Sequence, residues 1–158
     1  MMAAGCNQTE KKMTDTDNPF FIEYSTPFQV PPFDEIKDEH YLPAFEKGIA
    51  LHKKEIEEII NNPEEPDFEN TIAALDRSGE QLGKVQYVFN GVLSSNTNEQ
   101  LQEIAQKVAP MESGHFDDIN LNPELFKRVK AVYEHREHMD LTVEQKTLLD
   151  ETYKKFVR

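Results

Sequence analysis

Acidic and histidine side chains crowd together near the start of the first long amphipathic segment of this sequence. Five of them fall within seven residues: Asp34, Glu35, Asp38, Glu39 and His40. Carboxylate and imidazole groups can bind a divalent metal ion or act as general acids and bases. Carboxylates are also favoured at a helix N-terminus, where backbone N–H groups are unpaired and the helix dipole attracts negative charge. We interpret the cluster as the acidic beginning of a helix, with a metal site as the alternative.

Other histidines lack the spacing of a zinc peptidase helix. That helix carries H-E-x-x-H, which places two imidazole groups one turn apart beside a glutamate that activates water. Here His135 and His138 are three residues apart with Glu137 directly before the second, so a third metal ligand would have to come from elsewhere. His52 has no second histidine near it in the sequence. We interpret the His135–His138 pair as part of a solvated, charged helix face, with a zinc site as the alternative.

The stretch DDINLNPE resembles a calcium loop at three positions, Asp118, Asn120 and Asn122. An EF-hand loop also needs glycine at its sixth position for a sharp turn and a bidentate glutamate at its twelfth. This sequence has Pro123 and Val129 at those positions. We therefore predict that Asn122 caps a helix whose first residue is Pro123.

Nucleophilic catalysis has no sequence pattern to support it. The one cysteine, Cys6, lies in a polar N-terminal stretch, and no serine stands in a G-x-S-x-G turn. The glycines are scattered, so no phosphate-binding loop is predicted. The sequence thus predicts no catalytic residue and no metal-binding residue in this chain.

Cys6 is instead a candidate for lipidation. The stretch AAGC that ends at Cys6 resembles the end of a bacterial lipoprotein signal peptide, and a polar run follows it. The apolar segment that normally precedes such a motif is missing. We predict that residues 1–17 form a disordered tail, with a lipid anchor at Cys6 and a place in the cell envelope or periplasm. The alternative is a chance cysteine in the tail of a cytoplasmic protein.

The charge of the chain limits its partners. The 158 residues carry a formal net charge of −13, with 30% charged and 37% hydrophobic residues. Such a chain is repelled by phosphate backbones and by anionic membrane surfaces. Nucleic acid is therefore excluded as a partner, whereas basic peptides or basic protein faces remain possible. A single cysteine allows no internal disulfide.

The elements that follow the tail are an extended segment and a series of helices. Residues 18–33 contain four prolines and four phenylalanines, which predicts an extended strap across a helical body. Apolar stripes and capping patterns then predict helices over residues 41–60 and 67–93, from Thr97 through a kink at Pro110, from Asn122, and from Thr142 onward. We expect an all-α bundle of about five helices joined as hairpins.

The last predicted helix reaches the final residue without a stop signal, so we expect the chain to end in mid-helix. Its apolar stripe consists of Leu148, Leu149, Tyr153 and Phe156. We expect this stripe to be exposed and the helix to fray or to self-associate.

Several stretches occur in the order found in one family of enzymes. The most specific are PDFENTIAALDRSG and LNPELFKRVKAVY, and NPFF, PPFDEIKDEHYLPAFEKGI and NTNEQLQEIAQKVAPMESGH occur with them. The sequence resembles the N-terminal region of the thimet-oligopeptidase family of zinc metallopeptidases, in its peptidyl-dipeptidase and oligopeptidase A branch. The resemblance covers residues 18–158.

This resemblance implies a large helical enzyme in which short unfolded peptides enter a deep channel and lose dipeptides from their C-termini. In the family, the zinc ligands and the catalytic groups lie far toward the C-terminus. None of those motifs is present here, so no site residue carries over and this chain alone is expected to bind no zinc and to be inactive. Its implied role is one wall of the channel, with the missing C-terminal catalytic part as its partner. The alternative is a non-catalytic acidic helical module that binds basic peptides or a partner protein.

Overall fold

The computed structural model describes residues 18–157, and the prediction about the tail, including Cys6, concerns residues outside this range. The elements are 3-10 turns at Pro19–Phe21 and Pro27–Gln29, α1 (Asp38–Ile60), a π-helical turn at Phe68–Ala73, α2 (Ala74–Arg77), α3 (Glu80–Ser95), α4 (Glu99–Asn120), α5 (Pro123–His135), a 3-10 turn at Arg136–His138 and α6 (Val143–Phe156). Within residues 18–157 there is no strand, and the predicted all-α class is confirmed.

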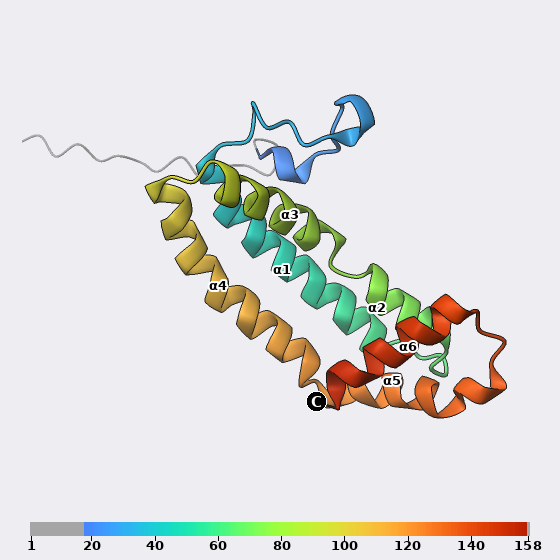
Figure 1. Cartoon of the computed structure of the whole chain (residues 1–158). Helices are drawn as coiled ribbons and strands as arrows, with labels where there is room; N and C mark the ends of the chain where they lie inside the picture. Colours follow the sequence, from blue (N-terminus) through green and yellow to red (C-terminus); the bar gives the residue numbers. More distant parts are fainter. Residues whose placement is uncertain (1–17, 158) are drawn as a thin grey trace, which may run out of the picture.

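Helix α1 is the central element of the fold. It packs against α3 on one side and α4 on another, while its C-terminal end contacts α5 and α2. The chain turns back after α5, so that α6 packs on α5 and on the π-helical turn (Figure 1). The strap lies over the N-terminal end of α1 and alongside α3 (Figure 1).

Helix α1 begins three residues earlier than predicted, because a histidine side chain caps it. The Lys37 backbone N–H donates to His40 Nδ1 at 3.0 Å. Asp38 and Glu39 occupy the first turn, where the unpaired N–H groups favour them. The interpretation of the acidic cluster as a helix start is thus confirmed, and the helix also contains Pro43 beyond its first turn.

The predicted helix over residues 67–93 is in fact two helical segments. Asp67 caps the first, as predicted, accepting the Asn70 N–H at 2.7 Å. The break occurs at Gly79, whose φ of 76° belongs to the left-handed region that glycine adopts without strain. Helix periodicity spans the break because both segments keep an apolar face toward α1.

The other caps follow from short polar side chains. Asn98, and not Thr97, caps α4 and accepts the Leu101 N–H at 2.8 Å, and α4 continues past Pro110 as expected. Asn122 caps α5 through the N–H groups of Glu124 and Leu125, both at 3.0 Å. Thr142 and Gln145 form the predicted capping box of α6.

Two hydrogen bonds hold the strap on the helices. The Asn18 side chain donates to the His40 carbonyl at 2.9 Å, and the Gln81 side chain donates to the Phe20 carbonyl at 2.6 Å. Phe20 is fully buried, but Phe28 is 99% exposed. The strap is therefore confirmed, although only its first half packs its aromatic side chains into the core.

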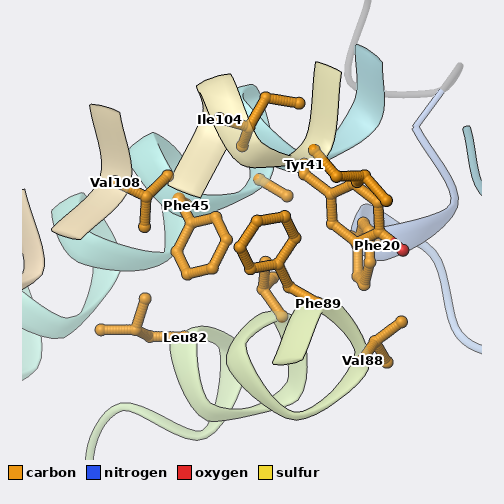
Figure 2. Close-up of a cluster of buried hydrophobic side chains, with 11 residues drawn as sticks. Phe20, Tyr41, Phe45, Leu82, Val88, Phe89, Ile104 and Val108 are labelled. Atoms are coloured by element: carbon orange, nitrogen blue, oxygen red, sulfur yellow. The ribbon is translucent and has the colours of Figure 1, made fainter. Parts of the chain in front are cut away.

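The core consists of three clusters, two of which include residues of α1. The first joins the strap, α1, α3 and α4, and Figure 2 shows Phe45 and Phe89 at its centre with Phe20 at one edge. The second joins the π-helical turn, α5 and α6, and the third joins the end of α1 to α4 and α5.

The apolar stripe of the last helix is packed, which corrects the expectation that it would be exposed. Leu149 is fully buried against Val129 and Val132 of α5. The Tyr153 ring stacks on Tyr133 with 3.9 Å between centroids, and Phe156 stacks on Phe126 at 5.8 Å. The hairpin formed by α5 and α6 supplies the partner surface that sequence inspection assumed to be absent.

Candidate functional site

The residues singled out from the sequence do not converge on one site. His135 donates its Nδ1–H to the Ala131 carbonyl of its own helix at 2.9 Å, and His138 lies exposed in the following turn. Asp118 pairs with Lys53 at 3.2 Å, and Asn122 is a helix cap. Among residues 18–157 no group of three or more histidine, cysteine, aspartate or glutamate side chains is arranged to hold a metal ion.

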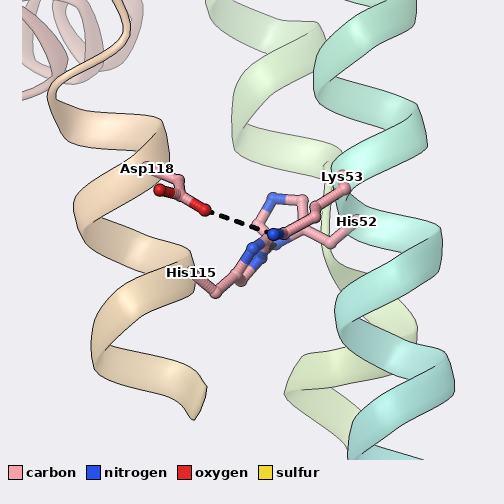
Figure 3. A network of polar contacts seen from close by, with 4 residues as sticks. All are labelled: His52, Lys53, His115 and Asp118. Atoms are coloured by element: carbon pink, nitrogen blue, oxygen red, sulfur yellow. Dashed lines mark hydrogen bonds and ion pairs between the residues drawn. The ribbon is translucent and has the colours of Figure 1, made fainter. Parts of the chain in front are cut away.

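Tertiary structure instead brings together two histidines that are 63 residues apart in sequence. His52 on α1 is 7% exposed and His115 on α4 is 2% exposed. His115 Nε2 lies 3.0 Å from His52 Nδ1, and the two rings meet edge to face with 4.8 Å between centroids. Figure 3 shows the two side chains pointing toward one another from facing helices. This pair is far more deeply buried than the Lys53–Asp118 ion pair between the same two helices.

A third group extends this contact to the break between α2 and α3. His52 Nε2 lies 3.0 Å from Ser78 Oγ, and Ser78 Oγ lies 2.7 Å from the Leu75 carbonyl oxygen. A carbonyl oxygen can only accept, so the Ser78 hydroxyl proton points to Leu75 and His52 must donate its Nε2–H to Ser78. His52 Nδ1 is then an acceptor, and His115 donates its Nε2–H to it. The network fixes both tautomers.

The proton positions decide what the network can do chemically. Activation of a serine nucleophile needs a histidine that accepts the hydroxyl proton. Here His52 donates to Ser78, which is the opposite direction. The histidines are also nearly inaccessible. The Ser78–His52–His115 arrangement is therefore not a nucleophilic site.

Gly79 provides the space for this network. A Cβ atom at this position would lie 2.8 Å from His52 Cε1 and Nδ1. The Gly79 N–H donates to Glu55 Oε2 at 2.7 Å, which ties the turn to α1 one helical turn away from His52. The same glycine thus permits the left-handed turn and the close approach of the imidazole.

Burial favours the neutral form of both histidines. It lowers the pKa of His52, an effect that Glu55 partly opposes. Burial is also the main reason that the pKa of His115 is lowered, with further lowering from His52 and Lys53 and opposition from Asp118. His115 Nδ1 is buried without a hydrogen-bond partner, which is consistent with a neutral ring whose second nitrogen carries no proton.

Two of the hollows in the surface lie next to these elements. One, of about 680 Å³, lies between the strap and α3 and is bounded by Phe21, Tyr24, Glu80, Lys84 and Tyr87 among others, with Lys84 Nζ 3.6 Å from the centroid of the Tyr24 ring. The other, of about 440 Å³, lies between α1 and the π-helical turn, and Glu55, Glu58, Glu69 and Arg77 line it. These hollows combine apolar and charged groups of both signs.

Comparison with known proteins gives relatives but no family profile that matches. The chain is 40% identical over 142 residues to dipeptidyl carboxypeptidase of Escherichia coli strain K12, covering 90% of this chain and 21% of that protein. It is 40% identical over 140 residues to dipeptidyl carboxypeptidase of Salmonella typhimurium. It is 26% identical over 127 residues to oligopeptidase A of Haemophilus influenzae, covering 80% of this chain and 18% of that protein. The chain is a homologue of part of these peptidases.

The predicted resemblance to the dipeptidyl carboxypeptidase and oligopeptidase A branch is thereby confirmed. The chain spans about one fifth of the length of these relatives. The zinc ion that the resemblance implies does not fit residues 18–157, because no set of three potential ligands converges there. In the His52–His115 pair, His115 Nε2 and His52 Nδ1 are hydrogen-bonded to one another. Within the same residues, no helix is long and apolar enough to cross a membrane.

Sequence reasoning missed the His52–His115 pair as a unit. The signal was present but indirect, because both histidines occupy positions on apolar stripes of their helices. A polar side chain at a core position needs a hydrogen-bond partner. The sequence does not say that each histidine is the partner of the other.

Proposed function

We propose that this chain forms one wall of the substrate channel of a zinc peptidyl-dipeptidase, which hydrolyses short peptides and releases dipeptides from their C-termini. The observation that carries the proposal is the 40% identity to dipeptidyl carboxypeptidase over 90% of the chain. The zinc and the groups that act on the peptide bond are contributed by a catalytic part outside residues 18–157. The 158-residue chain alone is inactive.

The arrangement of residues supports a peptide-contacting role and not a chemical one. The hollow between the strap and α3 offers apolar surface from Phe21 and Tyr87 beside the charged groups Glu80 and Lys84. An unfolded peptide presents backbone polar groups and mixed side chains, which such a surface can accept. The buried histidines lie away from this hollow and take no part in the contact.

The experiment is recovery of the native gene product with an antibody against residues 18–157, followed by intact mass, metal content and a peptide assay. We expect a species several times heavier than 18.3 kDa that releases dipeptides from a short synthetic peptide. Chelation should abolish this activity, and added zinc should restore it. The same peptide with an amidated C-terminus is the control, since release that depends on a C-terminal carboxylate distinguishes a peptidyl-dipeptidase from an endopeptidase.

A stable native species near 18.3 kDa that releases no dipeptide would overturn the proposal. It would favour the alternative function, an acidic helical module that binds basic peptides or a partner protein. The net charge of −13 and the hollow lined by Glu55, Glu58 and Glu69 support that alternative.

We also propose that the protein is held at the cell envelope by lipid on Cys6, with a cytoplasmic location as the alternative. The support is the AAGC stretch that ends at Cys6. The intact mass of the native product tests this directly. A mass increase at a peptide containing Cys6 that matches acyl chains is expected, and an unmodified cysteine would contradict it.

A further inference from the structure

The His52–His115 pair lies where two hydrophobic clusters meet. On α1, the residues before His52 pack in the cluster with the strap and α3, whereas those after it pack in the cluster with α5; these residues are Tyr41, Ala44 and Phe45 on one side and Ile56 and Ile59 on the other. On α4, the corresponding residues are Leu101, Ile104 and Val108 before His115 and Ile119 after it. The polar pair therefore interrupts the apolar contact between α1 and α4 at one level.

The third chain segment at this level is also interrupted. Helix α2 ends at Arg77 and α3 begins at Glu80. Between them Ser78 accepts from His52, and Gly79 takes a left-handed conformation against the His52 ring. All three segments thus have a polar or glycine position at the same level, and His52 contacts both of the others. We name this level, defined by His52, His115, Ser78 and Gly79, the joint.

An added proton is unfavourable at each nitrogen of the two rings, because the nitrogen already donates a proton, accepts a hydrogen bond or is buried without a partner. His52 Nε2 donates to Ser78 and His52 Nδ1 accepts from His115, so a proton on His52 Nδ1 would oppose the N–H of His115 across 3.0 Å. The remaining nitrogen, His115 Nδ1, is buried without a partner. A proton there would create a buried cation with an unpaired donor, and both features are costly.

We propose that the joint is an acid-sensitive contact: its neutral histidines hold α4 and the α2–α3 turn on α1, and protonation of the pair releases them. A proton on His52 Nδ1 replaces the hydrogen bond between the rings by repulsion, and a proton on His115 Nδ1 creates a buried cation without an acceptor. Either change occurs at the level where the two hydrophobic clusters are separated. The side chains that make up the clusters on either side are apolar residues and tyrosine, which take up no proton as the pH falls from 8 to 5, so these clusters keep their packing. The molecule consequently loosens between them.

The neighbouring charges do not compensate such a proton. On α1, Glu55 accepts the Gly79 N–H and Lys53 pairs with Asp118 of α4. The Lys53 and Asp118 side chains are 50% and 68% exposed, so solvent screens their effect. From the α2–α3 turn, Ser78 and Gly79 face the pair and carry no charge. The pKa values of both histidines lie below the ordinary value, in agreement with this geometry.

The sign of the pH effect follows from linkage. The unfolded chain binds protons on both histidines as the pH falls through about 6.5, while the folded chain resists them. Stability is therefore complete above that pH and decreases as the pH falls toward the lowered folded-state pKa values. For each histidine the unfolding equilibrium constant rises up to about tenfold per pH unit, and for two up to about a hundredfold.

The test compares urea unfolding of the 158-residue chain at pH 7.5 and 5.0 with that of H52Q/H115Q, in which glutamine keeps a donor and an acceptor but does not titrate. The wild-type unfolding constant should rise at least tenfold more on acidification than that of the double variant. H138Q, which removes an exposed histidine, is the matched control and should behave as the wild type. His40, whose pKa burial also lowers, contributes equally to all three proteins and cancels. Equal acid responses of the wild type and the double variant would overturn the proposal.

A second measurement needs no substitution and remains decisive if the double variant does not fold. The imidazole nitrogen signals of the wild-type chain are followed by NMR between pH 8 and 4.5. We expect His52 and His115 to stay neutral at pH values below the ordinary histidine value of about 6.5, with amide exchange rising first near Ser78 and Gly79 once they titrate. Ordinary titration of both buried rings near 6.5 without any change in exchange would contradict the proposal.

Discussion

At the residue scale, the position that most constrains the fold is Gly79. It combines a positive φ with a contact to the His52 ring that leaves no room for a side chain. Gly83, four residues later on α3, is different, since a Cβ atom there would meet nothing within 4 Å. A side chain therefore clashes at position 79, whereas position 83 in the next helical turn has room for one.

This difference makes a prediction. G79A should destabilise the chain by about 2–4 kcal/mol, because it adds backbone strain to a clash in a packed region. G83A should instead stabilise the chain by about 0.5–1 kcal/mol, because alanine is the better helix former. Urea unfolding at pH 7.5 measures both. Equal stability of the two variants would show that neither the left-handed turn nor the His52 contact constrains residue 79.

The histidines show how residue type alone can mislead. His135 and His138 have the more suggestive spacing, yet one ring is bonded to its own helix and the other is exposed. His52 and His115, which no motif connects, form the buried pair. His40, which the sequence places in the acidic cluster, caps its helix through Nδ1.

At the element scale, helix α6 is packed on α5, whereas the sequence led us to expect its apolar stripe to be exposed. The hairpin with α5 buries Leu149 completely and stacks two pairs of aromatic rings. Hydrophobic burial of this size orders a helix that would be marginal in isolation. We therefore expect α6 to be a stable part of the domain.

The corresponding prediction concerns Leu149 and Val143, which lie on the same helix. L149A should destabilise the chain by about 2–5 kcal/mol, because it removes a fully buried side chain and leaves a cavity. V143A, at a position that is 77% exposed, should change stability by less than about 0.5 kcal/mol. Thermal and urea unfolding provide the comparison. If L149A had as small an effect as V143A, α6 would not be packed on α5 in solution.

At the scale of the whole molecule, the net charge of −13 attracts basic peptides. Such general attraction has to be separated from binding at a specific site. The acidic groups are spread over exposed positions, where salt screens them over a Debye length of about 8 Å at 0.15 M. An acidic surface by itself attracts any basic peptide at low salt. A specific binding site would still hold its peptide when salt screens the surface charges.

We therefore predict that a lysine-rich peptide binds the 158-residue chain at low ionic strength and dissociates by about 0.3 M salt, because the attraction comes from screened surface charge. Titration calorimetry at both salt concentrations measures this, with a glutamate-rich peptide of the same length as the control. A lysine-rich complex that persists at high salt would support the binding-module alternative against the peptidase proposal.

Local interactions explain why so much of the fold could be predicted from the sequence. Helix caps at Asp67, Asn122 and Thr142 depend on residues within three positions, and the apolar stripes depend on the helical repeat. The family resemblance rests in the same way on ordered stretches of sequence. The break at Gly79 was missed because a left-handed glycine can sit inside an unbroken apolar period.

The amino-acid sequence by itself determined the all-α class, most helix boundaries and the relationship to peptidases. Only the tertiary structure decided that His52 meets His115, that burial lowers the pKa of both rings, and that α6 is packed. The physical reason is the sequence separation between the residues that interact. Caps and periodicity act within a helical turn or two, whereas the burial and pairing of His52 depend on a residue 63 positions away, which comes into contact only when α4 packs on α1.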